Sequence, residues 1–490
     1  MNNKIPWVAE RPNTVLFEQQ RSEIKLSFIV TIYNKAAFLP KVLQTIQQQT
    51  LGKDQIELIV IDDQSTDNGL QIVQEALPGF SNYQVIQMNE NTGGPGIPRN
   101  IGISRANGEF LTFVDADDWF SLDGFETLVQ LLELSGNDYA IGKTITKRDT
   151  DISVPGKYAS IRTRVNVKVT DIPLIYRFLA PQSRIMRTTF LRENGLIFPN
   201  LKFSEDTLFF MNVLRHAKTI STSDKTVTYL NRLGENNDSL TKNTDFLEKM
   251  QTKILALHYV LSLELDYVTK KQILSRIISL DFIERTMLRK SFLDPKNQAE
   301  RIQIMGEVFA AEPEFGVPLS EIIPDRVSYL AYTYLKYRDL ESAVKLVEWH
   351  FSEEKLEKFN PETGQYEWQT PAGMSNIPVP MKAIVNHVLS DDSKVVLSVT
   401  AFGEYDQVTG IELRSKVVDE KFVVVPPAYK QGHLSTYIIN QSDIAASFAE
   451  DTKLTMTLVY DDFRRVRLDP NTIVGDTAYF TVNNRLGYRI

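Results

Sequence analysis

The sequence predicts an α/β domain at the amino terminus, in which a mostly parallel sheet is covered by helices on both faces. Two observations predict this class. Short runs of β-branched and aromatic residues alternate with helical segments over about the first 120 residues, and these runs are apolar nearly throughout. Such runs are typical of strands buried on both faces, and ligands of such sheets bind at the carboxyl ends of the strands.

Four strands and three helices are expected in this domain. The predicted strands are Leu26–Tyr33, Ile56–Ile61, Tyr83–Met88 and Phe110–Val114. The predicted helices between them are Ala36–Gln49, Gly69–Leu77 and Pro98–Ala106. Polar residues that follow the strands should therefore meet at one edge of the sheet.

The chain of 490 residues is too long for one hydrophobic core, so about two to four domains are expected. A helical region is predicted downstream, where Ile273, Ile277 and Phe282 recur at helical spacing. Charged residues, Pro and Gly between Glu353 and Pro380 predict a linker or a loop-rich entry to the next domain.

The last part of the chain predicts a small β-sandwich. Its candidate strands are Lys394–Thr400, Lys421–Val425, Leu454–Tyr460 and Thr477–Val482. The expected divisions are residues 1–235 for the α/β domain, 236–352 for the helical region, 353–380 for the linker and 381–490 for the β-rich domain.

Composition excludes several classes of function. The chain has no cysteine, which excludes disulfides, iron–sulfur clusters, Cys-ligated zinc and thiol catalysis. Its net charge of −8 argues against general nucleic-acid binding but is compatible with a local basic groove. The first residues are polar, unlike a secretory signal, and the apolar runs are far shorter than the roughly 20 residues that cross a bilayer. We therefore expect a cytoplasmic protein with at most peripheral contact at the inner face of the membrane.

The sequence Asp115-Ala116-Asp117-Asp118 directly follows the fourth predicted strand. Two carboxylates at positions i and i+2, where a strand gives way to a turn, can converge on one hard divalent cation. An isolated motif of this kind also suits a solvated acidic turn. Its place at the carboxyl end of a buried strand favours the metal site.

Two further polar segments belong to the same predicted edge. Asp62-Asp63 follows the second strand, and its carboxylates can accept hydrogen bonds from a uracil N–H or from ribose hydroxyls; a neighbouring helix N-cap is the alternative interpretation. The loop Asn91–Asn100 contains three glycines, which allow a ligand to approach the backbone closely. In this loop Arg99 suits bidentate contact with phosphate oxygens, although an ordinary turn with a surface arginine fits as well.

Another acidic pair, Glu205-Asp206, follows Ser204 at the start of a predicted helix. A serine N-cap with acidic residues in the first turn is common in helices, so the pair suits a cap as well as a catalytic base. The stretch from Ile161 to Arg192 contains seven basic residues and a single acidic one. It is either a solvated face or a surface that holds an anionic acceptor.

Together, SFIVTIYN, VIDDQSTD, NTGGPGIPRN and FVDADD resemble the motifs of family 2 inverting glycosyltransferases of the GT-A fold. The resemblance covers the chain from Leu26 to Tyr229. GGPGIPRN and SED, followed by a helical region and a β-rich domain, are most similar to the wall teichoic acid glycosyltransferases of Gram-positive bacteria, which glycosylate poly(ribitol phosphate). Thr31 departs from the pattern of this family, because such enzymes commonly have Pro after the first strand. The implied fold is an α/β GT-A (Rossmann-like) catalytic domain with a helical region and a C-terminal β-sandwich-like domain.

The resemblance implies a role for each motif. It places Tyr33 against the uracil of the UDP-sugar, and Asp62 or Asp63, with Asn91, at the nucleoside. Arg99 would lie near the diphosphate, and Asp115 would also belong to the UDP-sugar site. Asp115 and Asp117 would hold Mn²⁺ or Mg²⁺. Asp206 would be the general base, with Glu205 beside it. A homo-oligomer, a trimer formed through the C-terminal domain, is also implied.

The expected function is transfer of GlcNAc or glucose from a UDP-sugar to a hydroxyl of wall teichoic acid, an anionic polyol phosphate polymer, with a β-linkage in the product. Two alternatives stay open: a family 2 glycosyltransferase that builds capsule or exopolysaccharide, and a non-catalytic glycan-binding protein. The basic stretch before Asp206 argues against a neutral glycan acceptor. The presence of every expected carboxylate argues against a non-catalytic protein.

Overall fold

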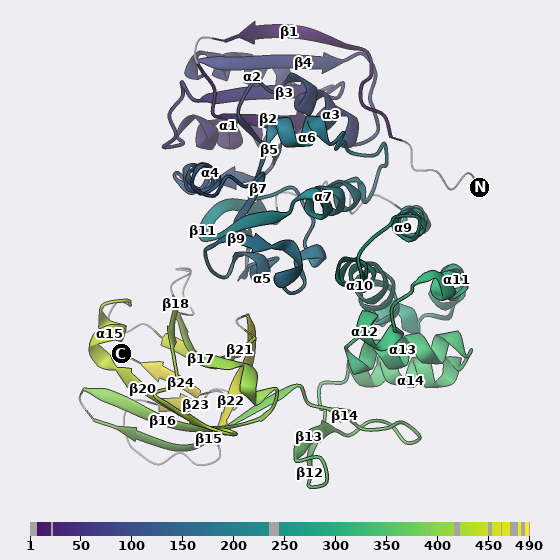
Figure 1. The fold of residues 1–490 in the computed structure, drawn as a ribbon, viewed down its shortest axis with the longest axis vertical. Coiled ribbons are helices and arrows are strands. Elements are labelled where there is room, and N and C mark those ends of the chain that lie inside the picture. Colours follow the sequence, from purple (N-terminus) through teal and green to yellow (C-terminus); the bar gives the residue numbers. More distant parts are fainter. Residues whose placement is uncertain are drawn as a thin grey trace. The chain divides into compact units, whose positions relative to one another are not determined.

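The structure is a computed structural model of the chain. It describes residues 7–20, 23–234, 245–391, 393–415, 422–448, 453–461, 463–470, 479–481 and 486–489. The chain divides into two compact units, Met1–Ala343 and Val344–Ile490. The α/β domain and most of the helical region therefore lie within one unit (Figure 1).

An eleven-stranded sheet forms the centre of the first unit. Its path runs β1-β4-β3-β2-β5-β10-β7-β11-β6, with β8 beside β7 and β9 beside β11. The strands are β1 (Asn13–Gln19), β2 (Leu26–Ile32), β3 (Ile56–Asp62), β4 (Asn82–Met88), β5 (Phe110–Asp115), β6 (Trp119–Phe120), β7 (Tyr139–Lys147), β8 (Ile152–Ser153), β9 (Arg164–Lys168), β10 (Arg184–Arg187) and β11 (Thr219–Asn231). The four predicted strands are β2 to β5, and they pair in parallel, which confirms the α/β class.

Helices pack on both faces of this sheet, as predicted. They are α1 (Leu39–Gln47), α2 (Gly69–Ala76), α3 (Gly96–Arg105), α4 (Gly124–Ser135), α5 (Lys157–Ser160), α6 (Thr188–Glu193) and α7 (Glu205–His216). The helices α1 to α3 are the three that the sequence predicts between the parallel strands, and α7 begins directly after Ser204.

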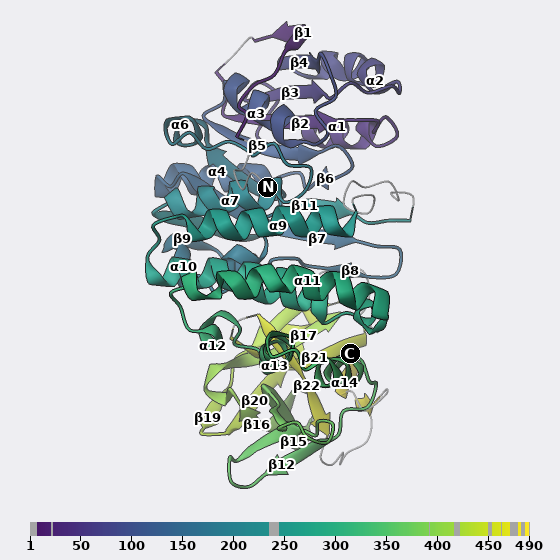
Figure 2. The ribbon, with the colours of Figure 1, turned by 90° about the vertical axis from the view of Figure 1, so that its right-hand side faces the viewer.

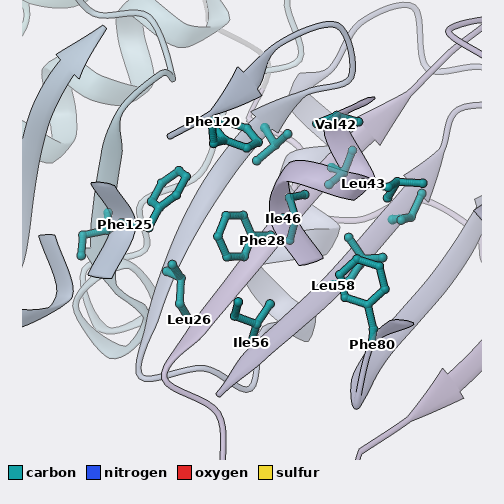
Figure 3. Close-up of a cluster of buried hydrophobic side chains, with 14 of the residues drawn as sticks. Leu26, Phe28, Val42, Leu43, Ile46, Ile56, Leu58, Phe80, Phe120 and Phe125 are labelled. Atoms are coloured by element: carbon teal, nitrogen blue, oxygen red, sulfur yellow. The ribbon is translucent and has the colours of Figure 1, made fainter. Parts of the chain in front are cut away.

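One face of the sheet is covered by a cluster of buried aliphatic and aromatic side chains (Figure 3). Phe28 of β2 packs edge-on against Phe125 of α4, with ring centroids 4.8 Å apart, and Ile46 of α1 belongs to the same cluster. Successive strand side chains point to opposite faces, so Ile29 points away from this cluster and toward α3. A Cβ at Gly102 of α3 would lie 2.3 Å from Ile29 Cγ2, so glycine is required for this close packing of α3 on β2.

An aromatic cluster covers the other face and anchors α7. Phe113 of β5 lies with its ring centroid 5.0 Å from Phe198 and 5.6 Å from Phe209. Phe198 and Phe209 stack at 3.8 Å, and Phe210 packs edge-on against Phe209 at 4.9 Å. Because Phe209 and Phe210 belong to α7, this packing holds α7 against β5.

Strand β1, which no pattern in the sequence predicted, pairs antiparallel with β4. Its residues alternate between exposed and half-buried positions, as is typical of an edge strand with one face toward solvent. Strands β6 to β11 build the remaining half of the sheet from the stretch between Trp119 and Asn231.

A helical layer follows, as predicted. Its elements are α9 (Phe246–Leu261), α10 (Tyr267–Leu274), a π-helix (Ser275–Met287), α11 (Pro295–Ala311), α12 (Leu319–Ile322), α13 (Arg326–Lys336) and α14 (Leu340–His350). Figure 2 shows α9, α10 and α11 side by side, and α9 contacts both of the others. The predicted periodic residues Ile273, Ile277 and Phe282 are all buried.

The second unit is rich in β structure, as predicted. The segment expected to be a linker forms a small sheet of β12 (Glu357–Asn360), β13 (Gln365–Trp368) and β14 (Ile377–Pro378). The remainder is β15 (Met381–Ser390), β16 (Lys394–Gly403), β17 (Val408–Ser415), β18 (Phe422–Val425), β19 (Tyr429–Gln431), β20 (Leu434–Asn440), α15 (Gln441–Ala445), β21 (Lys453–Tyr460), β22 (Arg464–Pro470), β23 (Tyr479–Thr481) and β24 (Leu486–Arg489). Its ten strands belong to one continuous sheet, joined by the parallel pair β15–β22, and the sheet curls so that β18 contacts β20. Over the described parts of both units, no helix has the length and hydrophobicity of a membrane span.

Candidate active site

The carboxyl ends of the parallel strands bring the predicted site residues to one edge of the sheet. In the register of the sheet, Ile32 of β2 lies opposite Asp62 of β3, and Thr31 lies opposite Asp115 of β5. The loops that follow these strands therefore start side by side, as the sequence predicts.

Asp62 and Asp63 are both buried and hydrogen-bonded within the protein. Asp62 Oδ1 accepts from the Ser65 backbone N–H at 3.1 Å. Asp63 accepts from the Thr92 backbone N–H at 2.9 Å and from the Asn91 side-chain amide at 3.2 Å, and burial raises the pKa of Asp63. These two carboxylates therefore order the loops after β3 and β4.

Tyr33 differs from these aspartates because it is 50% exposed. The next residue, Asn34, has a φ of 50° and accepts from the Thr66 backbone N–H at 2.8 Å, while its own N–H donates to Ser65 Oγ. These bonds join the loop after β2 to the loop after β3. They leave the Tyr33 ring at the edge of the sheet, where its face is available to a planar ligand.

The acidic motif after β5 holds its three carboxylates in different surroundings. Asp115 is partly exposed, and its Oδ2 accepts from Gln182 Nε2 at 2.8 Å. Asp117 forms an ion pair with Lys35 Nζ at 3.3 Å. Asp118 is buried and accepts from the Asn231 backbone N–H at 3.0 Å; burial, followed by the charges of Asp115 and Asp117, raises its pKa well above the usual value.

The donor set of the motif fits a divalent cation. Within the ranges that the structure describes, no three His, Cys, Asp or Glu side chains are grouped to hold a metal. Mn²⁺ or Mg²⁺ at a phosphate site needs only one or two carboxylates, because water and phosphate oxygens complete the shell. Burial and, after it, repulsion from Asp115 and Asp117 raise the pKa of Asp118, and a cation at this pair would relieve that repulsion.

Arg99 is only 3% exposed and connects two parts of the site. Its Nη2 donates to Asp115 Oδ1 at 2.8 Å, and its Nη1 donates to Glu205 Oε1 at 3.1 Å. The guanidinium also lies 5.2 Å from the centre of the Phe198 ring. The interpretation of Arg99 as a surface arginine in an ordinary turn is therefore wrong.

Glu205 and Asp206 occupy the first turn of α7. Ser204 has a φ of 66° and its side chain makes no capping hydrogen bond, so the capping interpretation of Ser204 is wrong. Burial, together with the charge of Asp206, raises the pKa of Glu205 to about 8 against the opposing effect of Arg99. Burial also raises the pKa of Asp206, while the charges of Arg99 and Arg276 oppose the shift.

Three arginines of the basic stretch from Ile161 to Arg192 are engaged within the protein. Arg184 is fully buried and donates to the Ala180 carbonyl at 2.6 Å. Arg187 pairs with Glu109 at 2.7 Å, and Arg192 donates to carbonyls at the end of α3. These bonds argue against polymer contacts by these three arginines, and an anionic-acceptor surface on the rest of the stretch stays a prediction.

The sequence did not predict a second group of cations, one of which, Arg276, acts electrostatically on Asp206. The side chains of Arg276, Lys253 and Arg285 surround the buried carboxylate of Asp281. The apolar spacing of this segment predicted only a helix, and nothing in the sequence placed these cations beside a residue on α7.

A protein-family model described as glycosyl transferase family 2 matches residues 27–193. The match begins in β2, ends with α6, and includes the acidic motif and Arg99. Residues 27–193 are a family 2 glycosyl transferase domain.

Two curated relatives of the glycosyl transferase domain act on the same polymer, as their names state. The poly(ribitol-phosphate) beta-N-acetylglucosaminyltransferase TarS of Staphylococcus aureus (strain MW2) is 33% identical over 296 residues, covering 59% of this chain and 50% of the relative. The poly(ribitol-phosphate) beta-glucosyltransferase of Bacillus spizizenii is 33% identical over 201 residues, covering 41% of this chain and 31% of the relative. The chain thus spans half the length of the first relative and less of the second.

Solved structures confirm the fold. S. aureus TarS residues 1–349 in complex with UDP-GlcNAc has a TM-score of 0.58 and 25% identity, covering 72% of this chain and 99% of that one. A longer S. aureus TarS structure has a TM-score of 0.59 and 23% identity, covering 95% of this chain and 85% of that one. The predicted GT-A class of the glycosyl transferase domain, with a helical region and a β-rich carboxyl-terminal part, is therefore confirmed.

The raised pKa of Glu205 gives a testable pH dependence of stability. Because the pKa is about 8 in the folded protein against an ordinary 4.5, the folded state binds more protons than the unfolded state between these values. The free energy of unfolding should therefore fall as the pH rises through this range. Glu205→Gln keeps an oxygen for Arg99 without titrating, so its melting temperature should fall less than that of the wild type between about pH 5 and pH 8. Glu75→Gln, at an exposed position of α2, is the control, and parallel profiles for Glu205→Gln and the wild type would contradict the raised pKa.

Proposed function

We propose that this chain is an inverting glycosyltransferase that moves GlcNAc or glucose from a UDP-sugar to a hydroxyl of wall teichoic acid, with a β-linkage in the product. The names of the two curated relatives and the UDP-GlcNAc complex of a structural relative support this substrate pair. The observation that carries the proposal is that Arg99 joins Asp115, at the end of β5, to Glu205, in the first turn of α7. The acidic motif and the candidate base Asp206 therefore share one site.

The proposed chemistry is a single displacement at the anomeric carbon of the sugar. Asp206 takes the proton from the acceptor hydroxyl as that oxygen attacks from the side opposite to UDP, so an α-linked donor gives a β-linked product. Burial raises the pKa of Asp206, which strengthens it as a base, while the charges of Arg99 and Arg276 favour the ionised form that accepts the proton.

The UDP moiety is proposed to lie along the carboxyl ends of β2, β3 and β5. Tyr33 would stack on the uracil, since its ring is exposed at this edge. Asn91 and the loops ordered by Asp62 and Asp63 would contact the nucleoside. Arg99 is buried behind Asp115, so it would act on the diphosphate side chiefly by fixing that carboxylate.

Mn²⁺ or Mg²⁺ is the proposed cofactor, and Asp117 and Asp115 would hold it. When bound, the cation would neutralise negative charge that develops on the departing diphosphate. The proposal is supported by the position of both carboxylates at the carboxyl end of β5, beside Asp118, whose pKa is raised by burial and then by the negative charges of Asp115 and Asp117.

The cationic cluster around Asp281 supports an anionic acceptor. Three cations surround this one carboxylate, and burial together with the charges of Arg285 and Arg276 lowers the pKa of Lys253 to about 8, although Asp281 opposes the shift. In the described part of the chain, Arg276 Nε has no hydrogen-bond partner although it is buried. The charge of Arg276 also acts on Asp206, so this excess of positive charge would attract an anionic acceptor toward the proposed base.

Asp206→Asn tests the base. A positioned base contributes roughly 10²- to 10⁴-fold, so kcat should fall by about that factor while the affinity for the UDP-sugar stays nearly unchanged. The measurement is transfer from UDP-GlcNAc and UDP-glucose to purified poly(ribitol phosphate) and poly(glycerol phosphate). Asp245→Asn, which changes the cap of α9, is the matched control. A preserved kcat in Asp206→Asn would remove the catalytic assignment.

The cofactor is tested by chelation. Treatment with EDTA should abolish transfer and added Mn²⁺ should restore it, whereas Asp117→Asn should stay inactive with Mn²⁺ because a carboxylate ligand is lost. Asp123→Asn, at an ion pair with Lys225 on the surface, is the control and should respond like the wild type. Full turnover in EDTA would show that no divalent cation takes part.

The acceptor is tested at Arg276. Arg276→Gln should raise the KM for poly(ribitol phosphate) and reduce the slope of log KM against log salt by about one unit, because each phosphate contact releases counterions. The KM for the UDP-sugar should change little. Arg301→Gln removes another buried arginine of the helical layer, bonded to the Thr286 carbonyl, and is the control. An equal effect of both variants on the acceptor KM would mean that Arg276 has only a structural role.

A further inference from the structure

Gln182 bridges two carboxylates of the acidic motif. It precedes β10 and is 7% exposed. Its Nε2 donates to Asp115 Oδ2 at 2.8 Å and to Asp118 Oδ2 at 3.3 Å. Since Arg99 holds the other oxygen of Asp115 and the Asn231 N–H holds the other oxygen of Asp118, Gln182 completes the support of both carboxylates.

A neutral amide is the side chain that suits this position. Its two N–H groups can each be directed at one carboxylate without adding charge to a site that already contains three acidic residues. The opposite amide orientation would place Oε1 against two carboxylate oxygens, which is unfavourable. In the present orientation Gln182 Oε1 is buried and has no hydrogen-bond partner among the described residues. The hydrogen bonds to the two carboxylates alone therefore explain the orientation of this amide.

The backbone next to Gln182 adopts a strained conformation that is fixed by several bonds. Ser183 has a φ of 58°, in the left-handed region that disfavours residues with a side chain. Its N–H donates to Thr228 Oγ1 at 3.2 Å, its Oγ donates to the Lys143 carbonyl at 3.0 Å, and its carbonyl accepts from the Gly142 N–H at 2.8 Å. Bonds to β7 and β11 therefore hold Ser183 in this conformation and direct Gln182 toward β5.

Arg184 holds the other end of the same loop. Its buried guanidinium donates to the carbonyls of Phe178 and Ala180 and to the Tyr139 hydroxyl. The loop from Phe178 to Arg184 is thus fixed on both sides of Gln182. This arrangement explains why Arg184 is buried, because its guanidinium holds the loop and does not face an external anion.

From these contacts we propose that Gln182 is a positioning residue of the UDP-sugar site, holding Asp115 and Asp118 in the orientation in which the donor binds. The inference rests on the proposed function and extends it to a residue outside the four motifs. Gln182 acts through the two aspartates and makes no contact with the reacting atoms.

The test compares Gln182→Met with Gln49→Met in the full chain. Gln49 is an equally buried amide at 4% exposed; its Nε2 also donates twice, to the carbonyls of Thr45 and Ser121, and its Oε1 likewise has no partner among the described residues. Both variants lose two amide hydrogen bonds, so both should melt at a lower temperature than the wild type. UDP affinity, measured calorimetrically with Mn²⁺ below the melting transition, should fall by roughly 10- to 100-fold only in Gln182→Met, as is usual when a partner that orients a ligating carboxylate is lost.

A second variant, Gln182→Glu, keeps the shape of the side chain and replaces the amide donor with an acceptor. It should weaken UDP binding at least as much as Gln182→Met, because it adds negative charge beside Asp115 and Asp118. With both Gln182 variants the KM for the UDP-sugar should rise, whereas the KM for the acceptor should stay near that of the wild type.

Equal UDP affinities in the wild type and both Gln182 variants would overturn the inference alone and leave the proposed function standing. An equal loss of UDP affinity in Gln182→Met and Gln49→Met would also overturn it, because a general loss of stability would then explain the effect. A wild type that binds no UDP at all would overturn the proposed function and, with it, this inference.

Discussion

The buried guanidinium of Arg99 donates to Asp115 at the end of β5 and to Glu205 at the start of α7. A charge taken out of water is unfavourable unless it is paired, and breaking such a buried pair typically costs about 3–5 kcal/mol. The positions of α3, which carries Arg99, of β5 and of α7 therefore depend on one another. The two clusters of buried side chains set these elements roughly in place, and the ion pairs align the carboxylates on them.

The charges of the site are arranged unevenly, which bears on the proposed transfer between two anionic substrates. Asp115, Asp117 and Asp118 crowd the end of β5, so this side favours a cation or a diphosphate that carries one. Around Asp281 three cations face one carboxylate, an excess of positive charge that would favour the proposed phosphodiester acceptor. Burial raises the pKa of Asp206, while Arg99 and Arg276 oppose the shift and Asp115 adds to it. The proposed base is thus influenced by charges of both groups, in keeping with the proposed transfer from a nucleotide-sugar to a polyanion.

The sequence predicted what depends on local pattern. The apolar runs located β2 to β5, and the rule that ligands gather at the carboxyl ends of parallel strands placed Tyr33, Asp62 and Asp115 at one edge. It could not predict contacts between distant residues: Arg99 and Glu205 are 106 positions apart, and Gln182 and Asp115 are 67 apart. The number of basic residues between Ile161 and Arg192 was a poor guide to a cationic surface for the same reason. Such a count does not distinguish a buried arginine such as Arg184 from an exposed one.

The first turn of α7 shows how two neighbouring carboxylates take different roles. Successive helical residues point about 100° apart, so Glu205 and Asp206 cannot both face Arg99. Glu205 takes the contact with Arg99, and its burial beside Asp206 raises its pKa to about 8 against the opposing charge of Arg99. A carboxyl group that is already engaged by Arg99 is less free to accept a proton from a substrate. Asp206 makes no ion pair of this kind in the described structure, and its carboxylate accepts from the Thr207 backbone N–H at 2.6 Å. The charges of Arg99 and Arg276 favour its ionised form, which agrees with its proposed role as the base.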